Sequence, residues 1–316
     1  MSNFKKETIW LKEISKEDKQ SFCVFEKRYK KECKNEKIPD SLNPNYLAYE
    51  DFLKELEKCK HQETLPEGFV LARYYLIYVD DRIVGGMNLR LGINDFILDD
   101  VGHIEYGIAP WERNKGYAKE ALKRILLRGL DFGMKDFLLI TDIDNIASQK
   151  VIQSCGGILE KNVENKKLFW IHLDTWQKEE SAMAIVFYKN KILSTKELIY
   201  GKEIISCPKG HIENKETHVE TAIRECFEET NVILTFNNYI TERTPYNIKF
   251  MDHHNKPVLK TIYPVYFQIQ EEGNLIAKEE RILEIKYLEI DDFLLMCSYD
   301  NVKEMVKDYI RVKDIK

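Results

Sequence analysis

No stretch of this 316-residue sequence approaches 18 consecutive apolar residues, so no segment is typical of a membrane-spanning helix. The first ten residues are polar and lack the apolar core of a secretory signal. Closely spaced cysteines are also missing, because no two of the seven cysteines lie within four residues of each other, which argues against zinc and thioredoxin-type pairs. Together these absences predict reduced, mostly buried thiols in a protein of the cytoplasm.

An excess of positive charge is missing as well. The chain has 48 Lys and Arg residues against 53 Asp and Glu residues, a formal net charge of -5. Dedicated nucleic-acid-binding proteins usually contain a basic domain, so we expect no such partner, and no membrane partner either. Anionic small molecules remain compatible with this charge balance, since the total charge of a chain does not reveal whether basic residues cluster locally.

What is present is enough apolar material for two cores. Hydrophobic residues make up 44% of the chain and charged residues 32%, as in globular proteins, and the length suggests two domains. The polar stretch at residues 174–181 interrupts the pattern of helices and strands. A boundary in this stretch predicts one domain over residues 1–176 and a second over 177–316; the oligomeric state does not follow from the sequence.

Hydrophobic periodicity predicts helices and strands in both domains. In the first, residues 12–60 are expected to be helical, followed by strands at 74–79, 83–91, 103–109, 137–141 and 168–173 and helices at 116–130 and 146–154. In the second, strands are expected at 183–188, 192–194, 246–251 and 258–270, and helices at about 216–229 and 293–310.

A strand, a loop and a helix follow one another in the segment GHIEYGIAPWERNKGYAKEAL, residues 102–122. The loop that opens the helix has the pattern R-x-x-G-x-A and consists of Arg113, Asn114, Lys115, Gly116, Tyr117 and Ala118. Glycine lets the backbone approach a ligand, and the free N–H groups at a helix start favour an anion such as pyrophosphate. An ordinary turn between strand and helix is the alternative.

This loop and its flanks resemble motif A of the GNAT N-acetyltransferases, whose R/Q-x-x-G-x-G/A loop binds the pyrophosphate of acetyl-CoA. Asn145 and the helix that ends at Gly156 resemble motif B of that family, in which the Asn contacts the CoA arm. The resemblance covers residues 65–173 and implies a mixed, largely antiparallel sheet with helices, acetyl-CoA as cofactor and a small-molecule amine as acceptor. It also implies that a backbone N–H near Ile108 binds the thioester oxygen.

The same resemblance suggests a catalytic base. In many GNAT enzymes a Glu on the strand before the loop is the general base, which here is Glu105, with a purely structural role as the alternative. His103 lies two residues away on the same strand face and is a weaker candidate. The general acid of the family is a Tyr seven residues after the motif B Asn. Ile152 stands at that position, which leaves Ser154, Tyr106 or water as the proton donor.

Three glutamates crowd one side of the helix predicted in the second domain. At 100° per residue, Glu225, Glu228 and Glu229 fall within an arc of about 100°. Their mutual repulsion is tolerable if the arc is solvated or if a divalent cation neutralises it. Carboxylate oxygens suit Mg²⁺ or Mn²⁺, which would also bridge the phosphates of a substrate.

The full spacing resembles the Nudix box, G-x5-E-x7-R-E-U-x-E-E-x-G-U with U aliphatic, starting at Gly210. The likeness covers residues 181–295 and implies an α/β/α sandwich in which the three glutamates bind metal, with Glu228 and Glu229 also catalytic. Glu216 and Arg224 are implied to form a structural ion pair. The sequence departs from the box at two positions, Cys226 and Asn231, and Asn tolerates the left-handed conformation of a helix end.

The Pro208-Lys209-Gly210-His211 start of the box resembles the diadenosine tetraphosphate hydrolase branch. That branch has a purine-stacking Tyr downstream, for which Tyr246 is the nearest candidate, with a plain strand aromatic as the alternative. Lys209 and Lys260 are candidate substrate contacts. Many Nudix enzymes keep a further acid near the position of Glu284, and two neighbouring acids, Glu279 and Glu280, compete for this role.

The predicted protein is therefore a bifunctional enzyme of mixed α/β class. Its first half would be an acetyl-CoA-dependent N-acetyltransferase, and its second half an Mg²⁺- or Mn²⁺-dependent hydrolase of nucleoside diphosphates linked to a group X, dinucleoside polyphosphates among them. The alternative is a Nudix hydrolase with a non-catalytic CoA-binding sensor domain. This alternative is favoured by Ile152, which stands at the position of the family's proton-donating Tyr.

Overall fold

The computed structural model describes residues 9–33, 42, 47–199 and 202–314. The chain divides into two compact units: unit 1 runs to Trp176 and includes Phe250–Pro257, and unit 2 comprises Gln177–Lys249 and the chain from Val258 onward. That each unit folds on its own stays a prediction.

Unit 1 is built on a four-stranded antiparallel sheet in the order β1, β2, β3, β4. The strands are Ile9–Glu13, Ala72–Val79, Arg82–Arg90 and Ile104–Ile108. In β2, Leu76 packs into one core cluster and Ile77 into another, because successive side chains point to opposite faces of a sheet. Burial on both faces explains why this strand is a nearly continuous apolar run.

Helices cover both faces of this sheet. One face packs against α1 (Lys19–Glu32) and α2 (Tyr49–Lys58), whose Phe22 and Phe52 join the cluster of Leu76. The other face packs against α3 (Tyr117–Asp131) and α4 (Ile146–Ser154), which join the cluster of Ile77. The loop between β4 and α3 therefore starts a helix that is anchored in the core.

A three-stranded antiparallel sheet in the order β5, β7, β6 completes unit 1. Its strands are Asp136–Asp142, Lys166–His172 and Ile158–Val163. A single bridge, between Gly102 and Leu139, links β5 to the chain just before β4. Short helical turns in the chain are η1 (Lys16–Asp18), η3 (Gln62–Thr64), the π-helical η4 (Ile97–Val101), η5 (Pro110–Glu112) and η6 (Phe236–Asn238).

Unit 2 contains most of an eight-stranded sheet, whose main path runs β10, β9, β8, β14, β12. The strands are β8 (Gln177–Tyr188), β9 (Lys191–Ile199), β10 (Lys202–Ser206), β11 (Lys209–His211), β12 (Tyr239–Glu242), β13 (Tyr246–Met251), β14 (Pro257–Ile269) and β15 (Ile282–Glu289). The two long central strands, β8 and β14, pair in parallel.

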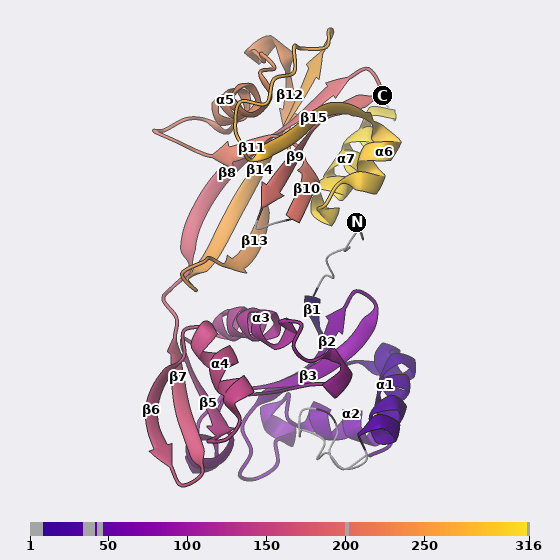
Figure 1. The fold of residues 1–316 in the computed structure, drawn as a ribbon. Helices are drawn as coiled ribbons and strands as arrows, with labels where there is room; N and C mark the ends of the chain where they lie inside the picture. Colours follow the sequence, from indigo (N-terminus) through magenta and orange to yellow (C-terminus); the bar gives the residue numbers. More distant parts are fainter. Residues whose placement is uncertain (1–8, 34–41, 43–46, 200–201, 315–316) are drawn as a thin grey trace. The chain divides into compact units, whose positions relative to one another are not determined.

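Helices also lie on both faces of this sheet (Figure 1). Helix α5 (His218–Thr230) packs through Ala222 on the face to which Ala184 of β8 points. Helices α6 (Ile290–Met296) and α7 (Asp300–Asp314) pack on the other face, with Ile185. The result is the three-layered α/β/α arrangement expected from the sequence.

Two secondary-structure expectations are wrong. Lys12 and Glu13 belong to strand β1 rather than to a helix, because Ile9 and Leu11 alternate with exposed Trp10 and pair with β2. Residues 34–41 and 43–46 of the predicted helical region lie outside the described residues. Residues 177–181 form the start of β8 instead of a polar break, since backbone pairing with β14 tolerates polar side chains at this end of the sheet.

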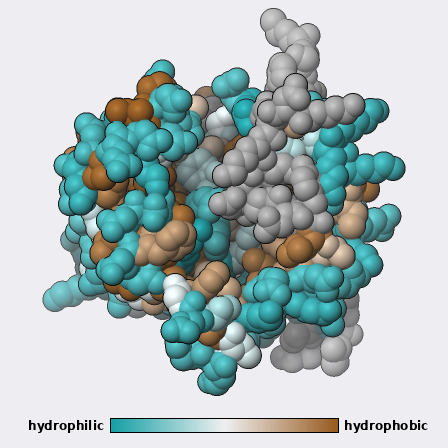
Figure 2. Space-filling model, turned by 90° about the horizontal axis from the view of Figure 1, so that it is seen from below, coloured by the Kyte–Doolittle hydropathy of each residue, from teal (hydrophilic) through white to brown (hydrophobic). Residues whose placement is uncertain are grey.

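Hydrophobic side chains appear on the face drawn in Figure 2 in separate groups among hydrophilic ones. Of the seven cysteines, all free, five are buried, as expected. Within the described ranges, no helix combines the length and the apolar character needed to cross a membrane.

Candidate active sites

The loop between β4 and α3 is open at its centre. Gly116 is the N-cap of α3 with φ of 82°, and a Cβ added to it would have no heavy atom within 4 Å. Glycine is therefore favoured here by its left-handed backbone, which Asn114 also adopts at φ 62°, and not by crowding. The first N–H groups of α3 have no carbonyl partner within the helix, so they suit an anion bound in this space.

Charged side chains in and beside this loop form hydrogen bonds and ion pairs that hold it in place. Arg113 Nε donates to the Ile108 carbonyl at 3.2 Å, and Lys115 Nζ lies 2.8 Å from the Glu112 carboxylate. Glu112 is buried and also lies 3.4 Å from Arg82 Nε. The sequence did not single out Glu112 or Arg82, since neither belongs to the loop pattern. Their contacts hold Lys115 at the edge of the loop.

Tyr117 and Ala118 face the core rather than the open space. The Tyr117 ring is buried, and its hydroxyl accepts a hydrogen bond from Arg82 Nη2 at 3.2 Å. Ala118 is partly buried against the cluster that contains Ile125. Any contact of these two residues with a ligand would therefore be made by their backbone.

Strands β4 and β5 diverge immediately after the Gly102 bridge. His103 N–H donates to the Leu138 carbonyl at 2.7 Å, and among the described residues no strand pairing links β5 to β4 itself. Ala109 N–H donates to Val84 on β3, so the neighbouring Ile108 N–H points away from β3. A backbone donor thus faces the gap between the diverging strands.

Glu105 lies on β4 opposite Asn88 of β3. Its carboxylate accepts a hydrogen bond from Arg90 Nη2 at 2.8 Å, and its side chain is 24% exposed. The ion pair holds the carboxylate in one orientation while leaving it partly open to solvent. A general base and a structural strand residue are both compatible with this position.

His103 has a structural contact that the sequence did not reveal. Its Nδ1 accepts a hydrogen bond from Leu138 N–H at 2.9 Å, and the side chain is buried. Burial lowers the pKa of His103, and the nearby Arg90 charge adds to the effect. The neutral ring holds β5 against the chain before β4, so its Nδ1 is not free to accept a proton.

Two hydroxyl groups lie close together at the start of α4, away from position 152. Ile152 is buried in the core. Tyr106 reaches from β4 to α4, where its hydroxyl lies 3.0 Å from Ser148 Oγ, and burial raises its pKa to about 12. Asn145 is exposed, and its side chain caps α4 by accepting from Ser148 N–H at 3.1 Å. A hydroxyl pair thus lies between β4 and α4.

Helix α5 is fixed at both ends by local contacts. Thr217 and Glu220 form a capping box at its start, and Asn231 ends it in the left-handed conformation with φ of 64°. The expectation that Asn substitutes for glycine at this end is confirmed. Arg224 donates to Glu216 at 2.8 and 2.9 Å, and these bonds lower the pKa of Glu216 to about 2.

Two of the three glutamates share the same guanidinium. Arg224 Nη1 lies 2.7 Å from Glu225 and 2.9 Å from Glu228. A Cβ on Gly210 would lie 1.9 Å from the Glu225 carboxylate, so a larger residue there would force this carboxylate to move. Burial raises the pKa of Glu225. The first glycine of the box thus leaves room for the Glu225 carboxylate to lie close to the backbone.

The third glutamate, Glu229, is fully buried among charges from other elements. It accepts a hydrogen bond from Arg281 Nη2 at 2.6 Å and from Lys209 N–H at 3.3 Å. Fully buried Glu197 of β9 lies beside it and contacts Lys209 Nζ at 3.1 Å and Arg281 Nη1 at 2.8 Å. Burial raises the pKa of Glu229, and the charge of Glu197 adds to the effect, so Glu229 depends on these cations to stay ionised.

Two family models match the chain, and they divide it between them. The model of the acetyltransferase (GNAT) domain matches residues 9–158, and that of the NUDIX domain matches residues 178–309. The chain joins a GNAT acetyltransferase domain to a Nudix hydrolase domain. Both the predicted families and the mixed α/β fold class are therefore confirmed, and at the level of its domains the protein is a bifunctional enzyme.

Solved structures similar to the Nudix domain share little sequence with it. An Ap4A hydrolase from C. elegans is 16% identical with a TM-score of 0.35, covering 44% of this chain and 99% of its own. The NUDIX domain of Shewanella oneidensis NrtR, complexed with ADP ribose, is 14% identical with a TM-score of 0.36, covering 43% and 88%. A bifunctional NMN adenylyltransferase/ADP ribose pyrophosphatase from Francisella tularensis is 19% identical with a TM-score of 0.35, covering 45% and 43%. No curated protein matches the chain.

Lys260 of the Nudix domain interacts with the charge of one of the three glutamates, Glu225. Its Nζ is 3.2 Å from His211 Nε2, which in turn is 3.1 Å from Glu179. Burial lowers the pKa of Lys260, while the charges of Glu179 and Glu225 oppose the change. The Lys209 side chain, in contrast, forms an ion pair with buried Glu197, so its amino group is already paired inside the protein.

The other sequence candidates, Tyr246 and Glu284, have partners of their own outside the glutamate cluster. Tyr246 is partly buried against the cluster of α6 and α7, and burial raises its pKa. Glu284 lies on β15 with its carboxylate 2.6 Å from Lys286. Glu279 contacts Arg281, which also contacts Glu229, so this competing acid is linked to the glutamates through a shared guanidinium.

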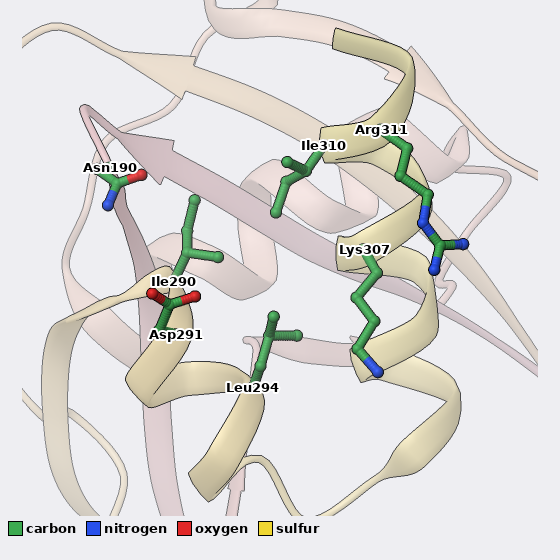
Figure 3. A pocket seen from close by; sticks show the side chains of 7 residues that line it. All are labelled: Asn190, Ile290, Asp291, Leu294, Lys307, Ile310 and Arg311. Atoms are coloured by element: carbon green, nitrogen blue, oxygen red, sulfur yellow. The ribbon is translucent and has the colours of Figure 1, made fainter. Parts of the chain in front are cut away.

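A cavity of about 330 Å³ lies elsewhere in the Nudix domain, between α6, α7 and the turn after β8 (Figure 3). Ile290, Leu294 and Ile310 point into it, and Lys307 and Arg311 lie on its α7 side. It shares no lining residue with the glutamate cluster, so it is separate from the site described above.

The three glutamates have the oxygen ligands that a divalent cation prefers, but their carboxylates do not converge on one point in this structure. Three carboxylates from one helix turn are hard oxygen donors of the kind that Mg²⁺ and Mn²⁺ prefer. Across the described part of the chain, however, no three acidic, His or Cys side chains converge as a metal centre. Arg224 contacts Glu225 and Glu228, and Arg281 contacts Glu229. Rotation of these side chains would have to accompany cation binding.

Proposed function

We propose that the GNAT domain transfers an acetyl group from acetyl-CoA to a primary amine. The observation that carries this proposal is the open loop at Gly116, where a left-handed glycine precedes the free N–H groups of α3. These groups fit the pyrophosphate of CoA. The Ile108 N–H, which faces the gap between β4 and β5, fits a thioester oxygen. Bound acetyl-CoA supplies the activated acetyl group.

The chain's own residues would handle the protons. Glu105 would accept the proton of the attacking amine, and Arg90 would hold its carboxylate in position. As the amide bond forms and the C–S bond breaks, the leaving thiolate needs a proton. Ser154 Oγ donates within its own helix to Val151, whereas the Tyr106 hydroxyl lies between β4 and α4, so Tyr106 is the better donor.

A CoA-binding sensor without turnover is the second candidate for this domain. The buried Ile152, which cannot donate a proton, favours it. Thiol release from acetyl-CoA by the full-length protein, in the presence of a panel of primary amines, separates the two. Release that depends on an amine supports transfer. CoA binding in calorimetry without release for any amine supports the sensor.

We propose that the Nudix domain hydrolyses a nucleoside diphosphate linked to a group X, dinucleoside polyphosphates among the candidates. The observation that carries this proposal is the cluster of Glu225, Glu228 and Glu229 on one side of α5. These residues would hold Mg²⁺ or Mn²⁺, which activates water and neutralises phosphate charge. Lys260, which lies beside His211, would contact a phosphate of the substrate.

Tyr246 and Glu284 remain weaker parts of this proposal. Tyr246 would have to leave its packing against α6 and α7 to stack on a purine, and Glu284 would have to leave Lys286. A screen of the 177–316 fragment against dinucleoside polyphosphates, nucleotide sugars and capped nucleotides, with Mg²⁺, tests the hydrolase. Full activity of the fragment would also show that the domains fold independently. No hydrolysis by the full-length chain of any of these substrates would contradict the proposal.

The compartment and partners belong to the same proposal. Seven free cysteines support a reducing cytoplasm, and small molecules are the expected partners of both sites. We propose no membrane or nucleic-acid partner, in line with the balanced charge of the chain.

A further inference from the structure

Arg281 is the centre of a charge network that the Nudix box does not contain. Its guanidinium contacts Glu197 at 2.8 Å through Nη1, Glu229 at 2.6 Å through Nη2 and Glu279 through Nε. Each of its three nitrogens is therefore engaged with a different carboxylate. Arg281 joins α5, β9 and the chain before β15.

Arg281 is more exposed and more loosely anchored than two of the carboxylates that it contacts. Glu197 and Glu229 are fully buried, on β9 and α5, whereas the Arg281 side chain is 41% exposed. The chain from residue 270 to 281 forms no helix or strand, although Leu198 N–H anchors the Arg281 carbonyl at 2.9 Å. The two carboxylates are fixed, and the arginine side chain is the member of the network that can rotate away without moving the backbone.

A positive charge, from a side chain or from a metal ion, is needed beside the buried carboxylates of Glu197 and Glu229. Two buried carboxylates side by side are strongly unfavourable unless a positive charge compensates them. Lys209 compensates Glu197 from one side, and Arg281 compensates both carboxylates from the other. A divalent cation held by Glu229 would supply the same compensation, and the guanidinium now lies on an oxygen that such a cation would use.

We propose that Arg281 is a built-in counter-ion which a divalent cation displaces from Glu229, and that the released guanidinium then binds a phosphate of the substrate. The planar fork of arginine matches phosphate oxygens, but its donors cannot serve carboxylates and phosphate together. Cation binding therefore prepares substrate binding. This inference rests on the proposed metal-binding function of Glu225, Glu228 and Glu229.

The experiment compares Arg281→Gln with the wild-type full-length protein. Calorimetry with Mn²⁺ alone should show at least fivefold tighter binding by the variant, because the competing charge is gone. With Mn²⁺ saturating, a non-hydrolysable nucleoside α,β-methylene diphosphate should bind the variant at least fivefold more weakly. The matched control is Arg311→Gln, an exposed arginine of α7 paired with Asp308, which should change neither affinity.

Opposite changes in the two affinities distinguish this role from a structural one. Weaker or unchanged Mn²⁺ binding by Arg281→Gln overturns the inference, and tighter Mn²⁺ binding with unchanged nucleotide binding overturns its phosphate part. Absence of Mn²⁺ binding by the wild type would instead refute the proposed metal site.

Loss of folding is also informative. If Arg281→Gln folds only when Mn²⁺ is present, as followed by circular dichroism, the cation replaces the guanidinium and the inference is supported. If the variant does not fold at all, the double variant Glu197→Gln/Arg281→Gln, which removes one buried charge together with its partner, takes its place in calorimetry. Failure of both variants to fold with and without Mn²⁺ would show a purely structural arginine and overturn the inference.

Discussion

The two candidate sites consist of different chemical groups, backbone N–H groups in one and side-chain carboxylates in the other. In the GNAT domain the groups proposed to face a ligand are backbone N–H groups, presented by a glycine turn, a helix start and a strand that diverges from its neighbour. In the Nudix domain they are side-chain carboxylates, two of which share one guanidinium and one of which is fully buried. Both would handle a pyrophosphate, the first directly through amides and the second through a cation.

This difference determines how each site fails. A backbone site depends on conformation and access, so it is sensitive to what replaces one glycine and tolerant of most neighbours. A site made of clustered charges depends on the balance of those charges, so removal of one carboxylate changes the protonation and pairing of the rest. The following experiments test this contrast, from the largest expected effect to the smallest.

The largest effect is expected from Gly116→Asp, which should abolish acetyl-CoA binding in calorimetry. The variant places a negative side chain where pyrophosphate would approach α3, at a left-handed position that favours glycine. Gly133→Asp is the matched control, because Gly133 has φ of 83° and open surroundings but lies beyond the other end of α3. Unchanged CoA affinity of the Gly116 variant would place the pyrophosphate elsewhere.

The second experiment tests the charge-built site. Glu228→Gln and Glu229→Gln should each lower hydrolysis at saturating Mg²⁺ by about 10³-fold, since each removes a charge from the cation site at constant volume. The far-ultraviolet circular dichroism should stay unchanged. Exposed Glu271→Gln serves as control and should retain activity. Turnover close to wild type in either variant would remove that glutamate from the active site.

The third experiment asks for a side-chain contribution in the backbone-built site. Glu105→Gln should lower acetyl transfer at neutral pH by about 10²–10⁴-fold if Glu105 is the general base. The deficit should shrink as pH rises, because more of the amine is then neutral, and CoA affinity should change little. Glu17→Gln, on the exposed surface of the same unit, is the control. A wild-type rate at pH 7 would leave Glu105 a structural residue.

The smallest effect concerns His103, whose buried ring lowers its pKa below the ordinary value of the unfolded chain. The unfolded state then binds the extra proton first as pH falls below about 6.5, so stability should decrease with falling pH, by at most about 1.4 kcal/mol per pH unit. His103→Asn, which keeps an acceptor for Leu138 N–H, should be less stable at pH 7 but should show a flatter dependence.

Tryptophan fluorescence reports this unfolding selectively, because all four tryptophans, Trp10, Trp111, Trp170 and Trp176, belong to unit 1. Exposed His172, 2.7 Å from Asp136, provides the control variant His172→Asn. Equal pH dependence in the wild type and in His103→Asn would mean that other groups cause the loss.

The sequence predicted the parts of both sites that are local along the chain. The Nudix box, the R-x-x-G-x-A loop, the core strands and the left-handed end of α5 all depend on residues a few positions apart, whose spacing on a helix or strand is known in advance. It missed β1 at residues 12–13 and the start of β8, because pairing with a distant strand decided those segments.

Tertiary structure decided which charges from distant parts of the chain meet, whereas the local pair of Glu216 and Arg224 was predicted from the sequence. Arg281 is 84 residues from Glu197 and 52 from Glu229, and Arg90 is 15 from Glu105. No periodicity relates such residues, since the distance along the chain between two strands or between a loop and a helix depends on everything in between. The sequence by itself thus determined the two families and the residues that are proposed to carry their chemistry. Folding determined their counter-ions, because burial makes a compensating charge obligatory without specifying where in the chain it must come from.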